Sequence, residues 1–316
     1  MQLEKNSNDS CSFGQCGTDK THGDRNAKKK EDEKRLRSRL ALIRNKILIL
    51  SGKGGVGKST VAVNLAVHLS RAGHQVGLLD IDIHGPSIPK LLGLEGQQLY
   101  PGEGNTILPV THKERLKVMS IGFLLSGPSE AVIVRGPMKH SAIKQFLTDV
   151  EWGKLDYLII DAPPGTGDEP LSVVQLLDKP KSAVIVTTPQ DLAILDVMKS
   201  INFCKQLDVP VIGVIENMSG FICPHCGKTV NIFKEGAGAK MAERMGVPFL
   251  SKIPVDPKIS EACDDGEPFV TQLSESPALD AFKDIAGPIE SLNAPDEKTE
   301  EGLSSLNKVF EGKRQG

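Results

Sequence analysis

Short runs of apolar residues alternate with longer segments of mixed polarity along most of this chain, from Lys46 to about Val255. Several of the runs are apolar at every position, which is typical of strands that helices cover on both faces of a sheet. Most of the longer segments between them have the length of a helix. The pattern predicts an α/β fold with a doubly wound, mostly parallel sheet. Its strands are expected at residues 47–50, 76–80, 116–121, 157–161, 183–187, 211–215 and 249–253.

The two ends of the chain are polar and differ from this central part. Residues 1–45 are predicted to form a flexible tail that includes a short helix over 31–45, where apolar residues fall at helical spacing. A closing helix is expected over 277–293, and a second polar tail over 294–316. The sequence therefore predicts a single domain over 46–293 with flexible tails on both sides.

Residues 52–60 read GKGGVGKST directly after the first predicted strand, which is the G-x-x-x-x-G-K-[ST] pattern of a phosphate-binding loop (P-loop). Backbone N–H groups in such a loop can surround a polyphosphate, and the helix that follows adds its positive dipole end. Lys58 is expected to bind the β/γ-phosphate oxygens, and Ser59 to bind Mg²⁺. The predicted nucleotide-binding residues here are Gly52, Lys53, Gly54, Gly55, Val56, Gly57, Lys58, Ser59 and Thr60.

Carboxylates end two further predicted strands. Asp80 and Asp82 are two residues apart, so both can face the crevice beyond the strand ends, where one can hold Mg²⁺ through water and the other can orient an attacking water. We assign the catalytic water to Asp82. Asp161 also fits an aspartate that holds Mg²⁺ through water, and Gly165 and Gly167 after it form a loop that can sense a γ-phosphate. ATP with Mg²⁺ is the expected ligand. The alternative for Asp80 and Asp82 is a pair of solvated side chains, and the alternative for the loop after Asp161 is an ordinary turn.

A C-x-x-C motif lies between the sixth predicted strand and the helix that follows it. Its thiols, Cys223 and Cys226, can point toward one metal, but a tetrahedral site or a cubane cluster needs four ligands. Either other cysteines complete the site or a symmetric partner supplies its own pair. A redox pair and inert loop cysteines are the alternatives. The remaining cysteines are Cys11 and Cys16 in the polar tail, Cys204 in a predicted helix and Cys263.

Composition excludes several classes of function. The formal net charge is −2 and no compact basic patch is evident, so nucleic acid is not an expected partner. No run of eighteen apolar residues predicts a membrane span, and the polar N-terminus lacks a secretory signal. A cytoplasmic location follows as an expectation, and cysteines in that compartment stay reduced.

Lys53 occupies a position that the general P-loop pattern leaves free. A second lysine there resembles the deviant P-loop of the MinD, ParA and nitrogenase iron protein group. In that group the extra lysine reaches across a dimer to the nucleotide of the partner. The resemblance implies a homodimer that sandwiches nucleotide, with Lys53 and Lys58 both in catalytic roles.

The full set of motifs, in order along residues 46–292, resembles the Mrp/ApbC-type iron–sulfur cluster carrier ATPases. The resemblance implies that Cys223 and Cys226 of two subunits hold a bridging [4Fe–4S] cluster, that Asn217 and Pro254 contact adenine, and that ATP binding or slow hydrolysis gates cluster loading or release. Cluster donors or scaffolds and recipient apoproteins are the implied partners. The motifs are the P-loop, the Asp80-x-Asp82-x-x-Gly-Pro-Ser element, Asp161-Ala-Pro-Pro-Gly-Thr-Gly-Asp, Thr187-Thr-Pro-Gln, Glu216-Asn-Met, Cys223-Pro-His-Cys and Ile253-Pro.

Three other functions remain open at this stage. A MinD-like positioning ATPase would need a membrane-binding tail, for which the C-terminal segment offers only a weak amphipathic stripe flanked by glutamates. A ParA-like DNA-segregation ATPase would need a basic surface. An ATPase with a structural zinc knuckle would use the same thiolates as an iron–sulfur protein. The stripe consists of Leu303, Leu306, Val309 and Phe310.

Overall fold

The structure is a computed structural model of the 316-residue chain. The tail cysteines Cys11 and Cys16 and the amphipathic stripe of the C-terminal segment lie outside the residues that it describes. The structure describes residues 19–293, except 84, 105, 114, 126–135, 191–192, 224, 233–235 and 273–275.

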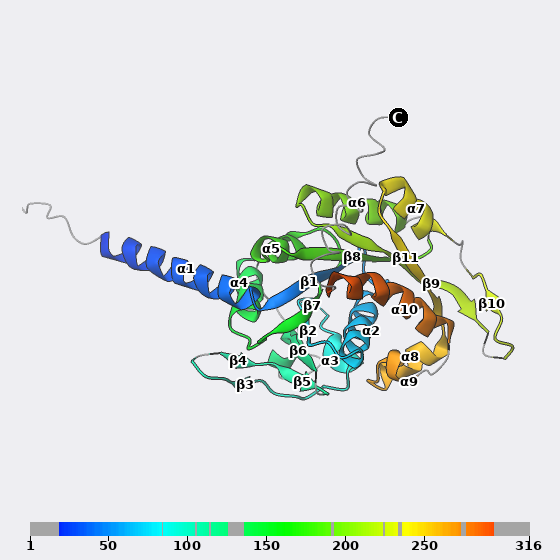
Figure 1. Ribbon diagram of the computed structural model, residues 1–316, viewed down its shortest axis with the longest axis horizontal. Helices are drawn as coiled ribbons and strands as arrows, with labels where there is room; N and C mark the ends of the chain where they lie inside the picture. The colour runs from blue at the N-terminus through cyan, green and yellow to red at the C-terminus, as the bar shows by residue number, and fades with distance from the viewer. Residues whose placement is uncertain are drawn as a thin grey trace, which may run out of the picture.

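A nine-stranded sheet forms the centre of the described part, in the order β10-β9-β8-β1-β7-β2-β6-β5, with β11 paired to the other side of β9 (Figure 1). The ladders among β9, β8, β1, β7, β2, β6 and β11 are all parallel, and β5 and β10 pair antiparallel. The predicted α/β fold with a mostly parallel sheet is confirmed. The strands are β1 Ile43–Leu50, β2 Val76–Asp80, β5 Val110–His112, β6 Leu116–Ser120, β7 Leu155–Asp161, β8 Lys181–Thr187, β9 Val211–Ile222, β10 Thr229–Val230 and β11 Phe249–Val255, with a separate pair of β3 Tyr100–Pro101 and β4 Ile107–Leu108.

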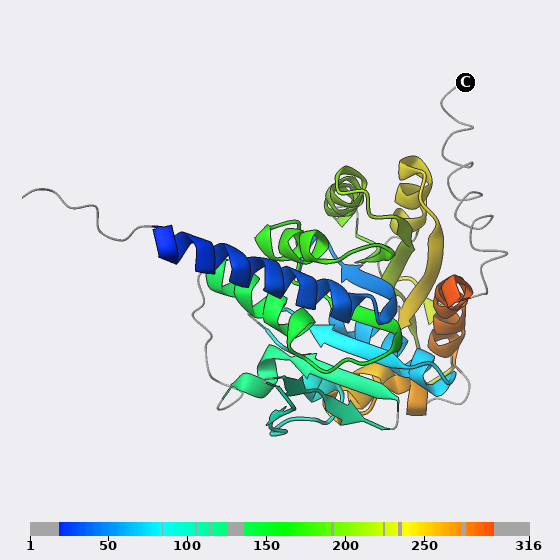
Figure 2. The ribbon, with the colours of Figure 1, turned by 60° about the vertical axis from the view of Figure 1, so that its left-hand side comes forward.

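Helices cover both faces of the sheet, as Figures 1 and 2 show. Successive residues of β1 face opposite sides, so Ile47 and Ile49 join one core and Leu48 and Leu50 join the other. The first core is covered by α2 Lys58–Arg71, α3 Ile88–Leu91, α8 Pro257–Asp264, α9 Phe269–Gln272 and α10 Pro277–Glu290. The second is covered by α1 Asp19–Leu40, α4 Gly136–Thr148, α5 Asp168–Leu176, α6 Ala193–Gln206 and α7 Ala237–Met245.

The structure differs from the sequence-based expectations at two places. The helix expected over 31–45 instead spans Asp19–Leu40, and β1 already begins at Ile43. Leu36 and Leu40 are buried against α4, so packing anchors the end of the helix, and Figure 2 shows its first turns extending outward from the sheet. Strand β9 runs to Ile222 instead of ending at residue 215, because its second half pairs with β10 and β11.

We predict that Ile159→Ala, in the centre of β7, lowers the free energy of unfolding by about 2–5 kcal/mol, because it opens a cavity in a fully buried part of the first core. Urea unfolding measures the change. The matched control is Ile232→Ala: this side chain is 57% exposed, so the same deletion should cost under about 0.5 kcal/mol. Equal losses in the two variants would contradict the assignment of the core.

Candidate nucleotide site and cysteine hairpin

The predicted P-loop connects the end of β1 to the start of α2. Gly57 caps α2 in the left-handed conformation, with φ at +79°. A Cβ atom on Gly57 would lie 2.2 Å from the Asn217 side-chain nitrogen, and one on Gly52 would lie 2.3 Å from Cβ of Asp196 in α6. Only glycine fits these two positions, so β9 and α6 hold the loop against the end of the sheet.

Lys58 points back toward the sheet and forms a buried ion pair. Its Nζ atom lies 2.5 Å from Oδ1 of Asp161 at the end of β7. The other carboxylate oxygen of Asp161 is buried and has no hydrogen-bond partner in the described structure. Ser59 and Thr60 follow in the first turn of α2 and are half-buried.

Asp80 lies beside this ion pair, because β2 and β7 are neighbours and Asp80 is in register with Asp161. Asp80 is fully buried and accepts hydrogen bonds from the Ser120 hydroxyl at 2.9 Å and from the Asp82 backbone N–H at 3.0 Å. Burial, and then the charge of Asp161, raise the pKa of Asp80 to about 8. Two buried carboxylates with one unsatisfied oxygen fit a divalent cation, which would relieve their repulsion.

Two further predicted residues lie at the rim of this site. The Lys53 ammonium donates to the Gln190 side-chain oxygen at 2.9 Å, in the loop after β8. Asp82 is half-buried just beyond Asp80. The loop after β7 is held to the P-loop, because the Gly165 N–H donates to the Ser51 carbonyl at 2.8 Å. The structure therefore brings the three strand ends and their loops to one edge of the sheet.

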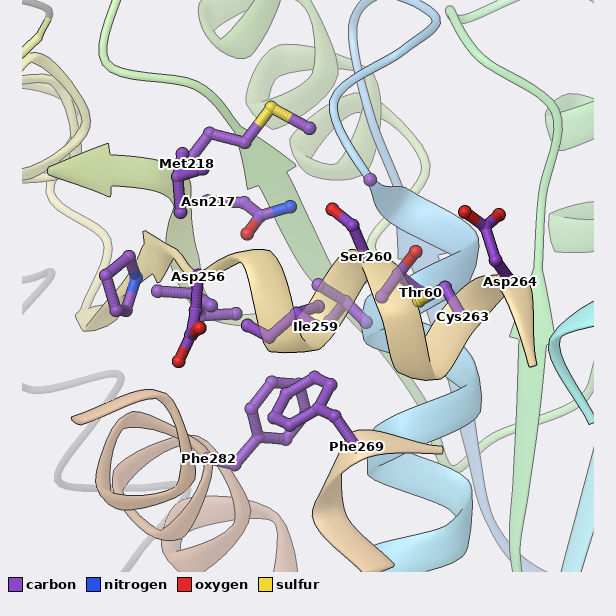
Figure 3. Close-up of a pocket in the computed structure, with 15 residues that line it drawn as sticks. Thr60, Asn217, Met218, Asp256, Ile259, Ser260, Cys263, Asp264, Phe269 and Phe282 are labelled. Atoms are coloured by element: carbon purple, nitrogen blue, oxygen red, sulfur yellow. The ribbon is translucent and has the colours of Figure 1, made fainter. Parts of the chain in front are cut away.

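A pocket of about 420 Å³ opens beside the first turn of α2. Figure 3 shows α8 crossing the pocket, with Asn217 and Met218 on one side of the helix and the edge-to-face pair of Phe269 and Phe282 on the other. The Asn217 side-chain N–H donates to the Val56 carbonyl of the P-loop at 2.9 Å. Asn217 and Pro254, the two residues expected at adenine, thus share one pocket with the P-loop. The lining residues are Gly57, Thr60, Val61, Asn217, Met218, Ile253, Pro254, Val255, Asp256, Ile259, Ser260, Cys263, Asp264, Phe269 and Phe282.

The C-x-x-C motif forms the turn of the hairpin between β9 and β10, which extends from the edge of the sheet in Figure 1. The Cys223 N–H donates to the Lys228 carbonyl at 3.0 Å, and the Gly227 N–H donates to the Cys223 carbonyl at 2.8 Å. Backbone N–H groups of His225 and Cys226 lower the pKa of the Cys223 thiol. Cys223 is half-buried and Cys226 is exposed. These features suit thiolate ligands on the surface.

The described residues contain no group of three or more His, Cys, Asp or Glu side chains that could hold a metal. The hairpin therefore supplies two thiols from this chain. Cys204 is fully buried in α6, as expected of a core residue. Cys263, which has no partner at metal spacing, instead lines the pocket beside the P-loop, a position that its sequence context does not indicate.

Glu216 belongs to one of the sequence motifs but is assigned no role from the sequence; it is fully buried at the point where β9 passes the pocket. Its carboxylate accepts hydrogen bonds from the Gly238 N–H at 2.6 Å, the Ser219 hydroxyl at 2.6 Å and the Gly236 N–H at 3.3 Å. It therefore caps the N-terminus of α7 and ties that helix to β9. An acidic residue inside an apolar strand, with glycines twenty residues later, was the available signal.

The family model described as "ParA: NUBPL iron-transfer P-loop NTPase" matches residues 42–290. The chain is 52% identical over 255 residues to an iron-sulfur cluster carrier protein of Methanocaldococcus jannaschii, covering 81% of this chain and 87% of the relative. It is 46% identical over 250 residues to the cytosolic Fe-S cluster assembly factor NUBP2 of Bos taurus, covering 78% and 92%.

Two solved structures share the fold. The nucleotide-binding protein of Archaeoglobus fulgidus in complex with ADP is 41% identical, with a TM-score of 0.69 over 79% of this chain and 96% of that one. The cell division ATPase MinD of Pyrococcus furiosus is 25% identical, with a TM-score of 0.56 over 78% and 99%. No helix in the described part of the chain is long and apolar enough to cross a bilayer.

We predict that Asp80→Asn stabilises the nucleotide-free protein above neutral pH by roughly 1–3 kcal/mol. The folded chain holds the Asp80 proton up to about pH 8, whereas the unfolded chain releases it near pH 4, so the wild type loses stability as the pH rises through this window. The amide can keep both hydrogen bonds, because the Ser120 hydroxyl can accept as well as donate. Urea unfolding at pH 5 and pH 8.5 should show a small difference at the lower pH and a larger one at the higher. A constant difference would contradict the buried charge.

Proposed function

The chain belongs to the family of NUBPL iron-transfer P-loop NTPases, and on that premise we propose that it is an ATP-dependent iron–sulfur cluster carrier that passes a [4Fe–4S] cluster to apoproteins. One observation carries the proposal: a surface hairpin with two thiols ends a strand, β9, whose middle residues Asn217 and Met218 line the pocket beside the P-loop. Nothing in the positioning functions of MinD-like or ParA-like ATPases requires such a hairpin.

The pocket supports ATP as the nucleotide. One of the two side-chain N–H groups of Asn217 donates to the Val56 carbonyl, which fixes the orientation of the amide and leaves its oxygen available to a base. An adenine amino group can donate to that oxygen, whereas the O6 atom of guanine would repel it. We place adenine between Asn217 and Pro254, and the phosphates along residues 52–60 with Lys58 as their counter-charge.

The buried carboxylates support a Mg²⁺ site. Ser59 and Asp161 would hold the ion, and the unpaired oxygen of Asp161 marks a place for its shell of ligands. Bound Mg²⁺ would neutralise charge that develops on the phosphates. Asp82 would then orient water for slow hydrolysis. Asp80 would stay beside the metal as a hydrogen-bonded neighbour.

Lys53 supports a homodimer. Within one chain its ammonium contacts Gln190 and not the buried phosphate site. We propose that it reaches the nucleotide of the partner, which keeps hydrolysis slow until two subunits meet. The same dimer would supply the two cluster ligands that one hairpin lacks, because Cys223 and Cys226 from two chains give four thiolates on a two-fold axis. The cluster, as cargo, would sit between subunits whose geometry ATP controls, so the two sites must influence each other reciprocally.

A carrier of this kind has two classes of partner: proteins that donate or assemble the cluster, and apoproteins that receive it. We place the protein in the cytoplasm, in line with its bovine relative, which is described as a cytosolic factor.

Lys58→Ala should lower ATP turnover by at least about 100-fold, because it removes the charge that faces the developing negative charge on the phosphates. Malachite-green phosphate release measures turnover. The matched control is Lys199→Ala on α6, whose side chain is 71% exposed, and it should keep full activity. Circular dichroism of both variants reports the fold, since Lys58 also pairs with Asp161. A folded Lys58→Ala protein with unchanged turnover would refute the P-loop assignment.

Cys223→Ala and Cys226→Ala should each abolish cluster binding and transfer after anaerobic reconstitution with iron and sulfide, while ATP hydrolysis persists. One substitution removes two of four ligands from a cluster shared by two chains. Visible absorbance, iron content and activation of an apoprotein are the measurements, and about four irons per dimer are expected in the wild type. Cys263→Ala is the matched control and should keep the cluster, since that thiol lies in the nucleotide pocket.

Two outcomes would contradict this assignment of the ligands. Full iron in the Cys223→Ala/Cys226→Ala double variant would move the cluster elsewhere, with Cys11 and Cys16 as the remaining pair. Stoichiometric zinc without charge-transfer absorbance would make the hairpin a structural zinc knuckle.

A further inference from the structure

Strand β9 passes the nucleotide pocket and continues directly into the cysteine hairpin. It is parallel to β11, and the register jumps within this ladder: Ile253 pairs with Asn217, and Val255 pairs with Phe221. Three residues of β9, 218–220, therefore lie opposite one residue of β11. This insertion is a β-bulge at the edge of the pocket, and bulges commonly redirect a strand beside a functional site.

The backbone of the bulge is strained at one residue. Met218 has φ at +59°, in the left-handed region that side chains with a Cβ atom disfavour, and Gly220 has φ at +82°. Glycine carries no penalty at the second position, but methionine does at the first. The structure around Met218 must hold it in place.

Two contacts before the bulge join β9 to the P-loop. Asn217 donates to the Val56 carbonyl at 2.9 Å. A Cβ atom on Gly57 would lie 2.2 Å from the Asn217 nitrogen and 3.8 Å from the Met218 methyl carbon, so both side chains lie against the loop. The P-loop cannot shift without moving them.

The residues after the bulge connect it to the cysteines without an intervening loop. Phe221 and Ile222 pair with β10, and the Cys223 N–H bonds to Lys228 in the same hairpin. A Cβ atom on Gly220 would lie 2.9 Å from the Thr229 methyl carbon, so β10 packs directly on the bulge. Movement of the bulge is therefore transmitted to the hairpin.

Glu216, on the other side of the bulge from the hairpin, is fixed, and it also holds Ser219 inside the bulge. The Ser219 hydroxyl donates to Glu216 at 2.6 Å, and the same carboxylate caps α7. The backbone of Glu216 lies in the sheet between two parallel strands, opposite Thr187 of β8 on one side and Lys252 of β11 on the other. A displacement at the pocket is thus confined to residues 217–220 and the hairpin beyond them.

We propose that residues 218–220 are a hinge that couples nucleotide occupancy to the Cys223–Cys226 hairpin, with Asn217 as the residue that positions the hinge against the P-loop. The inference rests on the proposed function and adds how nucleotide binding would regulate the cluster site. Nucleotide that enters the pocket meets Asn217, changes its hydrogen bond to the P-loop, and through the strained backbone at Met218 shifts the population of two hairpin positions.

The test measures the alkylation rates of Cys223 and Cys226 in the full-length, reduced, cluster-free protein at fixed pH. Iodoacetamide labels the thiols, and peptide mass spectrometry quantifies each site with and without saturating Mg-ATP. Saturation is checked separately by equilibrium binding of a fluorescent ATP analogue. Cys204 is fully buried and should stay unlabelled, which reports an intact fold. ATP should change the hairpin rates by about five-fold or more in the wild type.

Met218→Gly and Met218→Ala form a matched pair. Both remove the side chain from the pocket, but only glycine relaxes the backbone at φ +59°. Met218→Ala should keep the response to ATP, and Met218→Gly should lose most of it because a relaxed hinge no longer holds two distinct positions. Asn217→Asp keeps the shape of the side chain but has no N–H to donate to Val56, so it should also lose the response at saturating ATP.

The outcomes separate this inference from the function on which it rests. A wild-type protein that binds ATP without any change in labelling rates would overturn the hinge and leave the carrier function standing. Equal responses of the glycine and alanine variants would also overturn it. A protein that fails to bind ATP at all would overturn both.

Discussion

The buried pairing of Lys58 with Asp161, next to the carboxylate of Asp80, is the constraint on which the site depends. Charges this deep in a protein persist only when they are paired, and the pairing is possible because β1, β2 and β7 are neighbours whose carboxyl ends meet at one edge. Lys58 balances the charge of Asp161, and Asp80 beside them keeps its proton because its pKa is raised to about 8. In the proposed metal–nucleotide complex, the metal cation would take over Asp161 while Lys58 turns to the phosphates.

That exchange takes place one hydrogen bond away from the strand that carries the cysteines. The P-loop is held by Asn217, Asn217 belongs to β9, and β9 ends at the hairpin. The fold thus joins the P-loop to the thiols of Cys223 and Cys226 through a single strand, with Glu216 anchoring that strand to the sheet. A carrier needs such a connection, since a cluster that binds tightly must still be released to its recipient.

Much of this arrangement could be predicted from the sequence. Apolar runs located the parallel strands, and the motif residues Lys58, Asp161 and Asp80 meet as expected because strand ends converge in such folds. The family resemblance is confirmed by the match over residues 42–290.

The remaining features depend on tertiary contacts. The bond from Asn217 to Val56 joins residues 161 positions apart, and the second half of β9 is a strand only because β10 and β11 pair with it.

The most direct measurement of the central claim is native mass spectrometry of the anaerobically reconstituted protein. The account predicts a dimer that carries one [4Fe–4S] cluster, and iron-free chains once the cluster is removed. A monomer that holds a complete cluster, or a dimer with one complete cluster in each chain, would contradict it.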